Sequence, residues 1–123
     1  MNKTLVTIGG ILYLIFGVFH MTFIRFFSKS PDFAQIKPFL SKIIQMLNIG
    51  VITFFLMLGV TMLVYHNEIL TTKLGRAFLI VSSAFFIIRG AAEFFFNEPV
   101  LPLVGTMLVC SVLYMVPVIN SKK

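Results

Sequence analysis

The stretch Ala77–Phe96, AFLIVSSAFFIIRGAAEFFF, decides the fold of this chain. It is almost wholly apolar, yet it carries one pair of opposite charges, Arg89 and Glu93, four residues apart. An α-helix needs about 20 predominantly apolar residues to cross the hydrocarbon core of a bilayer. The stretch therefore predicts a transmembrane helix that holds a charged pair.

Three further apolar runs of similar length accompany this helix. Arg25 closes the first run, and Asn97-Glu98-Pro99 separates the third run from the fourth. The predicted spans are residues 5–24, 46–65, 77–96 and 100–119. The connections are short, so we expect residues 1–123 to form a single domain, an all-α integral membrane protein built as a four-helix up-down bundle.

The longest connection, FSKSPDFAQIKPFLSK, leaves two alternatives open. It contains a suitable helix start, Ser30-Pro31-Asp32. An apolar edge would follow, formed by Phe33, Ile36 and Leu40. These features favour a short helix lying at the membrane interface. The other alternative is an irregular loop. On the opposite side of the second span, His66 and Glu68 are expected to lie in a solvated loop.

The composition supports a membrane protein and argues against a nucleic-acid-binding protein. Of the 123 residues, 59% are hydrophobic and only 11% are charged, whereas soluble domains carry about 25% charged residues. The formal net charge is +6, but the basic residues are spread over loops and termini, where they meet anionic lipid head groups. We therefore expect membrane lipids as partners and no nucleic acid. A homo-oligomer or a larger membrane complex is also compatible with the sequence.

Four spans place both termini on one side of the membrane. The terminal side would collect Lys3, Lys73, Arg76, Lys122 and Lys123. The other side would collect Arg25, Lys29, Lys37 and Lys42. Because cytoplasmic loops carry an excess of Lys and Arg, this small difference slightly favours cytoplasmic termini.

Polar residues from three spans are predicted to share one level of the membrane. Counting from the span ends at about 1.5 Å per residue puts His20 about 7 Å and Asn48 about 3–5 Å below the same surface. The same count puts Glu93 about 6 Å and Arg89 about 12 Å below it. Polar side chains in membrane helices turn toward neighbouring helices. His20, Asn48, Arg89 and Glu93 therefore form the predicted ligand-binding site.

The third span should present one stripe to the protein interior, with Ser82, Arg89 and Glu93 on it. Its outer face is expected to include Ile80, Ile87 and Phe94. A charged residue at the centre of a membrane helix costs about 2.5–3.5 kcal/mol on insertion scales. The Arg89–Glu93 pair therefore requires further partners, a watery pocket or a function.

Three functions are compatible with these residues. The first is binding of an amphipathic ligand, such as a lipid or a quinone, with Arg89 as an anion anchor. The second is a structural or accessory subunit of a membrane complex, in which the polar residues only order the helices. The third is a membrane enzyme with His20 and Glu93 as an acid–base pair. It ranks lowest, because the sequence offers no nucleophile and no metal-ligand set; no cofactor and no catalytic residue is assigned.

Four segments of the chain also carry a resemblance. They are GVFHMTF at 17–23, IIQMLNIG at 43–50, EILTTKLGRA at 68–77 and RGAAEFFF at 89–96. Together they resemble a group of small four-span bacterial membrane proteins. The resemblance implies a bacterial four-helix membrane protein, and it assigns no activity, ligand or site. We expect such a protein in the inner membrane.

Overall fold

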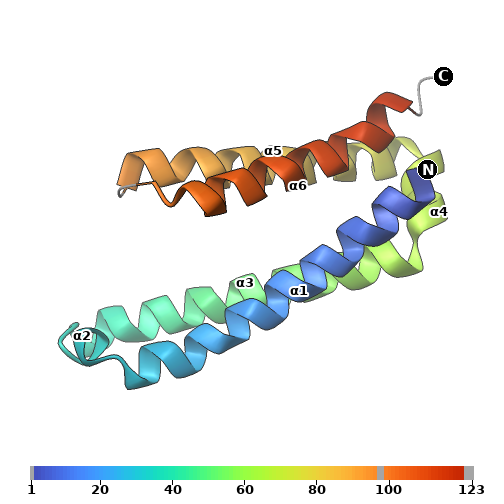
Figure 1. Ribbon diagram of the computed structural model, residues 1–123. Coiled ribbons are helices and arrows are strands. Elements are labelled where there is room, and N and C mark those ends of the chain that lie inside the picture. Colours follow the sequence, from blue (N-terminus) through green and yellow to red (C-terminus); the bar gives the residue numbers. More distant parts are fainter. Residues whose placement is uncertain (1, 97–98, 121–123) are drawn as a thin grey trace. The chain divides into compact units, whose positions relative to one another are not determined.

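The computed structural model describes residues 2–96 and 99–120, and the elements in these two ranges are helices without any strand (Figure 1). In chain order they are α1 (Asn2–Lys29), α2 (Pro31–Ala34), α3 (Pro38–Val64), α4 (His66–Thr71), α5 (Lys73–Phe96) and α6 (Leu101–Asn120). The predicted all-α fold is confirmed.

Helices α1, α3, α5 and α6 are long and apolar enough to cross a membrane, which makes the chain a multi-pass membrane protein by the length and composition of its helices. They cover the predicted spans to within one residue. Two of them are clearly longer than their spans, since α1 continues to Lys29 and α3 begins at Pro38. Proline suits the first turn of a helix, where its missing N–H leaves no hydrogen bond unmade.

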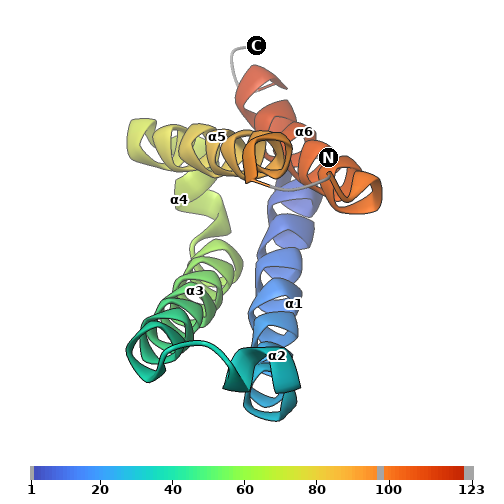
Figure 2. The same ribbon diagram turned by 90° about the vertical axis from the view of Figure 1, so that its left-hand side faces the viewer.

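The longest connection contains the short helix α2, so the short-helix alternative is confirmed for residues 31–34. Ser30 occupies the N-cap position and Pro31 the first turn. Phe33 stacks on Phe27 of α1, with ring centroids 4.9 Å apart. Figure 2 shows α2 beside the end of α1, on the way to α3.

The loop expected around His66 and Glu68 is wrong, because these residues belong to helix α4. Ile69 of α4 is buried. A Cβ atom on Gly75 would lie 2.3 Å from the Cα atom of Ile69. Only glycine therefore allows the first turn of α5 to contact α4 this closely.

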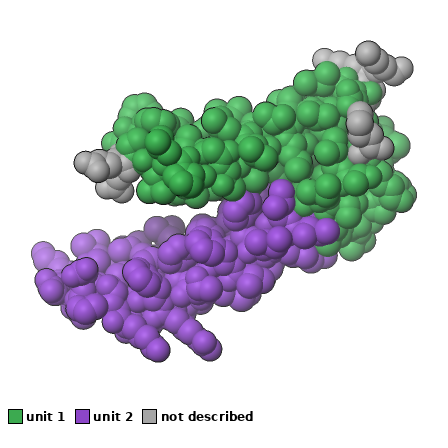
Figure 3. Space-filling view, viewed as in Figure 1, with its two compact units in different colours: residues 1–9, 62–123 green, residues 10–61 purple. Residues whose placement is uncertain are grey.

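The chain forms two compact units (Figure 3). Unit 1 comprises residues 1–9 and 62–123, and unit 2 comprises residues 10–61. Helix α1 thus contributes its first turns to unit 1 and the rest of its length to unit 2.

In unit 2, small residues bring α1 and α3 together as an antiparallel pair. A Cβ atom on Gly59 would lie 2.7 Å from Leu14 and 2.9 Å from the carbonyl oxygen of Gly10. Gly17 lies equally close to Leu56. Between the glycines, the ring of Tyr13 packs against Phe55. In lipid, where apolar burial drives little association, close backbone approach of this kind supplies the packing energy.

In unit 1, α5 and α6 form a second antiparallel pair, which the start of α1 joins. The rings of Phe86 and Tyr114 stack with centroids 5.5 Å apart. The Tyr114 hydroxyl donates to the carbonyl oxygen of Gly9, 2.9 Å away. At the start of α1 and the end of α6, the side-chain amide nitrogen of Asn120 lies 3.5 Å from the side-chain oxygen of Asn2. The beginning and the end of the described chain are therefore neighbours within unit 1.

We expect Gly59→Ala to lower the free energy of unfolding by about 1–3 kcal/mol, the usual cost of overpacking a close contact. The reason is that a backbone oxygen, that of Gly10, cannot move aside as a flexible side chain can. Gly50→Ala is the matched control, because a Cβ atom there meets nothing within 4 Å. Unfolding of both variants in detergent micelles measures the difference. Equal stability of the two variants would contradict this packing.

Candidate functional site

Two residues of the predicted site, His20 and Asn48, form a reciprocal pair between α1 and α3. The imidazole Nδ1 of His20 lies 3.0 Å from the side-chain oxygen of Asn48. The Asn48 amide nitrogen donates to the backbone oxygen of His20 over 3.1 Å. Asn48 is only 8% exposed, and His20 is half-buried. Asn48 therefore links α3 to α1 by two hydrogen bonds.

The two hydrogen bonds together determine which ring nitrogen of His20 carries the proton. The backbone oxygen of His20 can only accept, so the amide nitrogen of Asn48 must face it. The amide oxygen of Asn48 then faces the ring, and because that oxygen also only accepts, Nδ1 must donate. In the neutral imidazole this arrangement leaves Nε2 with a free lone pair.

Aromatic side chains surround the imidazole of His20. The ring centroids of Phe23, Phe55 and Phe19 lie 5.3, 5.5 and 6.0 Å from it. No described residue forms a hydrogen bond with Nε2. The site therefore offers one hydrogen-bond acceptor beside several aromatic rings, a combination suited to a flat head group with a hydroxyl.

The site predicted from the sequence did not include these three phenylalanines. The available signal was their spacing. Phe23 lies three residues after His20, which places it next to His20 on the helix surface, and Phe19 directly precedes His20 in the sequence. Phe55 lies two turns beyond Asn48 on α3, toward the middle of the helix.

The other predicted pair, Arg89 and Glu93, forms an ion pair along one edge of α5. The Glu93 side chain is 12% exposed, whereas the Arg89 side chain is 46% exposed. Arginine before glutamate is the less favourable order for such a pair on a helix. The Glu93 side chain therefore lies against neighbouring residues, while much of the Arg89 side chain remains exposed on the surface of the chain.

The expectation that Arg89 faces inward is wrong. The stripe of α5 that packs in unit 1 contains Leu79, Ser83, Phe86 and Gly90, all buried. Arg89 lies one position before Gly90 and so stands at the margin of this stripe. The other expectations for this helix hold, because Ser82 is buried and the outer residues Ile80, Ile87 and Phe94 are 45%, 50% and 60% exposed.

The structure thus brings the four predicted residues together as two pairs, one in each unit. His20 and Asn48 belong to unit 2, and Arg89 and Glu93 belong to unit 1. That all four share one site stays a prediction. Among residues 2–96 and 99–120, no three His, Cys, Asp or Glu side chains are grouped so that they could hold a metal ion.

Sequence reasoning missed two buried polar contacts in unit 1. Ser83 Oγ lies 3.0 Å from the backbone oxygen of Ser111 and 2.8 Å from its hydroxyl. Since the backbone oxygen only accepts, Ser83 donates to it and the Ser111 hydroxyl donates to Ser83, so both hydroxyls are satisfied. The second contact is the Tyr114–Gly9 hydrogen bond. Its signal was a tyrosine within an apolar span, because a buried phenol requires a partner.

Comparisons of the chain with protein-family models, with curated proteins and with solved structures gave no match. The site therefore rests on its own geometry.

Nitrogen NMR of histidine-labelled protein checks the tautomer of His20. We expect both histidines to carry the proton on Nδ1, because His66 Nδ1 also faces a backbone oxygen, that of Leu63, at 3.0 Å. Asn48→Leu should change the tautomer signal of His20 alone and cost about 1–2 kcal/mol of stability, since two interhelical hydrogen bonds are lost. A wild-type His20 protonated on Nε2 would contradict the assignment.

Thermal unfolding in detergent checks the coupling of the charged pair. We expect Glu93→Gln to lower Tm more than the double change Arg89→Leu with Glu93→Gln, because the single change leaves a cation without its partner. Arg89→Leu alone should leave Glu93 unpaired and also lower Tm. Harmless and additive single changes would show that the two residues are not coupled.

Proposed function

We propose that this protein binds an amphipathic molecule in the membrane, and that His20 accepts a hydrogen bond from a hydroxyl of its head group. One observation supports this proposal above all others. Asn48 uses both the oxygen and the nitrogen of its side-chain amide to orient His20 and to keep the proton on Nδ1. The free lone pair of Nε2 is then available as a hydrogen-bond acceptor beside the aromatic rings.

A quinol fits this combination well. Its flat ring can pack against Phe19, which is exposed, or Phe23, which is half-buried, in an offset or edge-to-face arrangement. Its hydroxyl can donate to Nε2, while its isoprenoid tail stays in the hydrocarbon. A quinone presents only acceptors, which a lone pair cannot engage. The proposed site therefore prefers the reduced form of the molecule.

A role as an accessory subunit of a membrane complex is a second candidate, and a separate observation favours it. The Arg89 guanidinium has five N–H donors, and among the described residues it pairs with Glu93. Spare donors in lipid are costly unless another group meets them. A carboxylate or a backbone carbonyl of another subunit would supply that group.

We infer that the protein lies in the bacterial inner membrane with both termini on the cytoplasmic side. The neighbouring positions of Asn2 and Asn120 within unit 1 support termini at the same end. The small excess of basic residues on the terminal side supports the cytoplasmic orientation.

The binding proposal is tested with decylubiquinol and decylubiquinone added to the protein in phosphatidylcholine nanodiscs. We expect the reduced form to raise the unfolding temperature and the oxidised form to have little effect. His20→Phe keeps an aromatic ring but removes Nε2, and it should abolish the response. Asn48→Leu should weaken the binding several-fold, because His20 is no longer held in one tautomer.

The other histidine supplies a matched control. His66 lies in unit 1, and His66→Gln should leave the response to decylubiquinol unchanged. Equal responses to the two redox forms, or a full response from His20→Phe, would refute the proposal.

A further inference from the structure

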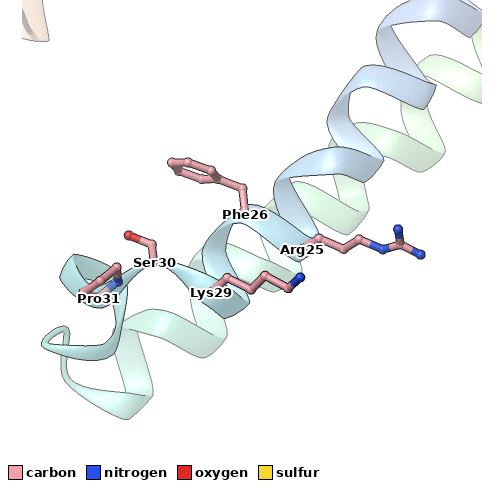
Figure 4. A pocket seen from close by; sticks show the side chains of 5 residues that line it. All are labelled: Arg25, Phe26, Lys29, Ser30 and Pro31. Atoms are coloured by element: carbon pink, nitrogen blue, oxygen red, sulfur yellow. The ribbon is translucent and has the colours of Figure 1, made fainter.

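A hollow at the end of α1 lies outside the site described above. It has a volume of about 390 Å³ and is lined by Arg25, Phe26, Lys29, Ser30 and Pro31, all in unit 2. Figure 4 shows Arg25 and Lys29 extending in the same direction from successive turns of α1, with Ser30 and Pro31 at the start of α2. Two cations one helical turn apart therefore flank a space large enough for a small head group.

The two cations have no carboxylate partner within the described chain. Both side chains are exposed, and neither takes part in an ion pair, although Asp32 follows Lys29 by only three residues. The Ser30 hydroxyl is also unused, since it makes no capping hydrogen bond to α2. The hollow thus presents two positive charges and one hydroxyl that the protein itself does not satisfy.

The surroundings of the hollow suit the level of lipid head groups. Arg25 closes the first apolar span, and Phe26 is 62% exposed beside it. Arginine and lysine at such a boundary keep their apolar stems in the hydrocarbon and place their charges among the head groups. Residues 25–42 contain Arg25, Lys29, Lys37 and Lys42 against the single acid Asp32. This end of unit 2 therefore attracts anions generally, and the hollow adds a defined place for one.

We propose that this hollow binds the phosphate of an anionic phospholipid. The Arg25 guanidinium and the Lys29 ammonium group donate charge-assisted hydrogen bonds to the phosphate oxygens. The exposed ring of Phe26 contacts the adjoining acyl chain. A phospholipid matches the hollow better than a free anion does, because the site combines charge with an exposed apolar ring at the membrane boundary.

Native mass spectrometry tests the proposal on the full chain, released from nanodiscs of phosphatidylcholine that contain a minor share of phosphatidylglycerol. Wild-type protein should retain phosphatidylglycerol in preference to phosphatidylcholine. The double variant Arg25→Gln with Lys29→Gln should lose retained phosphatidylglycerol by about tenfold, since two charged contacts are removed. Both side chains are exposed, so the variant should keep its unfolding temperature.

The matched control is the double variant Lys37→Gln with Lys42→Gln. It removes the same charge from the same end of unit 2 but leaves the lining of the hollow intact. Its retention of phosphatidylglycerol should change by less than about twofold. Equal losses in the two double variants would show diffuse attraction and overturn the site. Displacement of the lipid by inorganic phosphate alone would overturn the assignment to a phospholipid.

Discussion

Hydrocarbon offers no hydrogen-bond partner, so a polar group that enters it must be satisfied by the protein. Several buried polar side chains in the described part of the chain answer that constraint with a bond between helices. Asn48 ties α3 to α1, and Ser83 ties α5 to α6. These bonds also settle the rotation of each helix about its axis, because a polar side chain has only one neighbour that it can reach. The same constraint that orders the helices thus orients His20.

Glycine determines how closely the helices approach, and the polar bonds depend on that approach. Gly59 and Gly17 allow α1 and α3 to meet with backbone atoms in near contact. Gly90 does the same for α5, since a Cβ atom there would lie 3.3 Å from Met107. Asparagine and serine are short side chains, and their hydrogen bonds between helices form only where the helices are this close. The small residues therefore account both for the close packing of the helices and for the hydrogen bonds between them.

Hydropathy alone was enough to predict the four spans, but it could not predict where the helices end. The length of an apolar run reflects the thickness of the hydrocarbon core. The backbone hydrogen bonds of a helix continue into the polar sequence beyond that run, as they do from Arg25 to Lys29. The level of polar residues, counted by the rise per residue, was enough to pair His20 with Asn48. That count works because both residues lie near the same connection, between α1 and α3.

The misplacement of Arg89 and the missed serines have physical causes. The predicted and observed inner stripes of α5 differ by a rotation of about 60°, which a short pattern of apolar residues does not resolve. Serine is ambiguous in a membrane helix, because its hydroxyl can bond its own backbone, as Ser28 does with Ile24. Only the neighbouring helix shows that Ser83 instead bonds Ser111.

The hydrogen bond from Tyr114 to Gly9 joins residues 105 positions apart in the chain. Synthesis proceeds from the N-terminus, so the acceptor has left the ribosome long before its donor is made. Helix α1 must therefore keep a face open until α6 arrives. Gly9 has no side chain, so it leaves space on that face for the ring of Tyr114. Unit 1 can thus assemble only after α6 has been made, because it joins the start of α1 to α6.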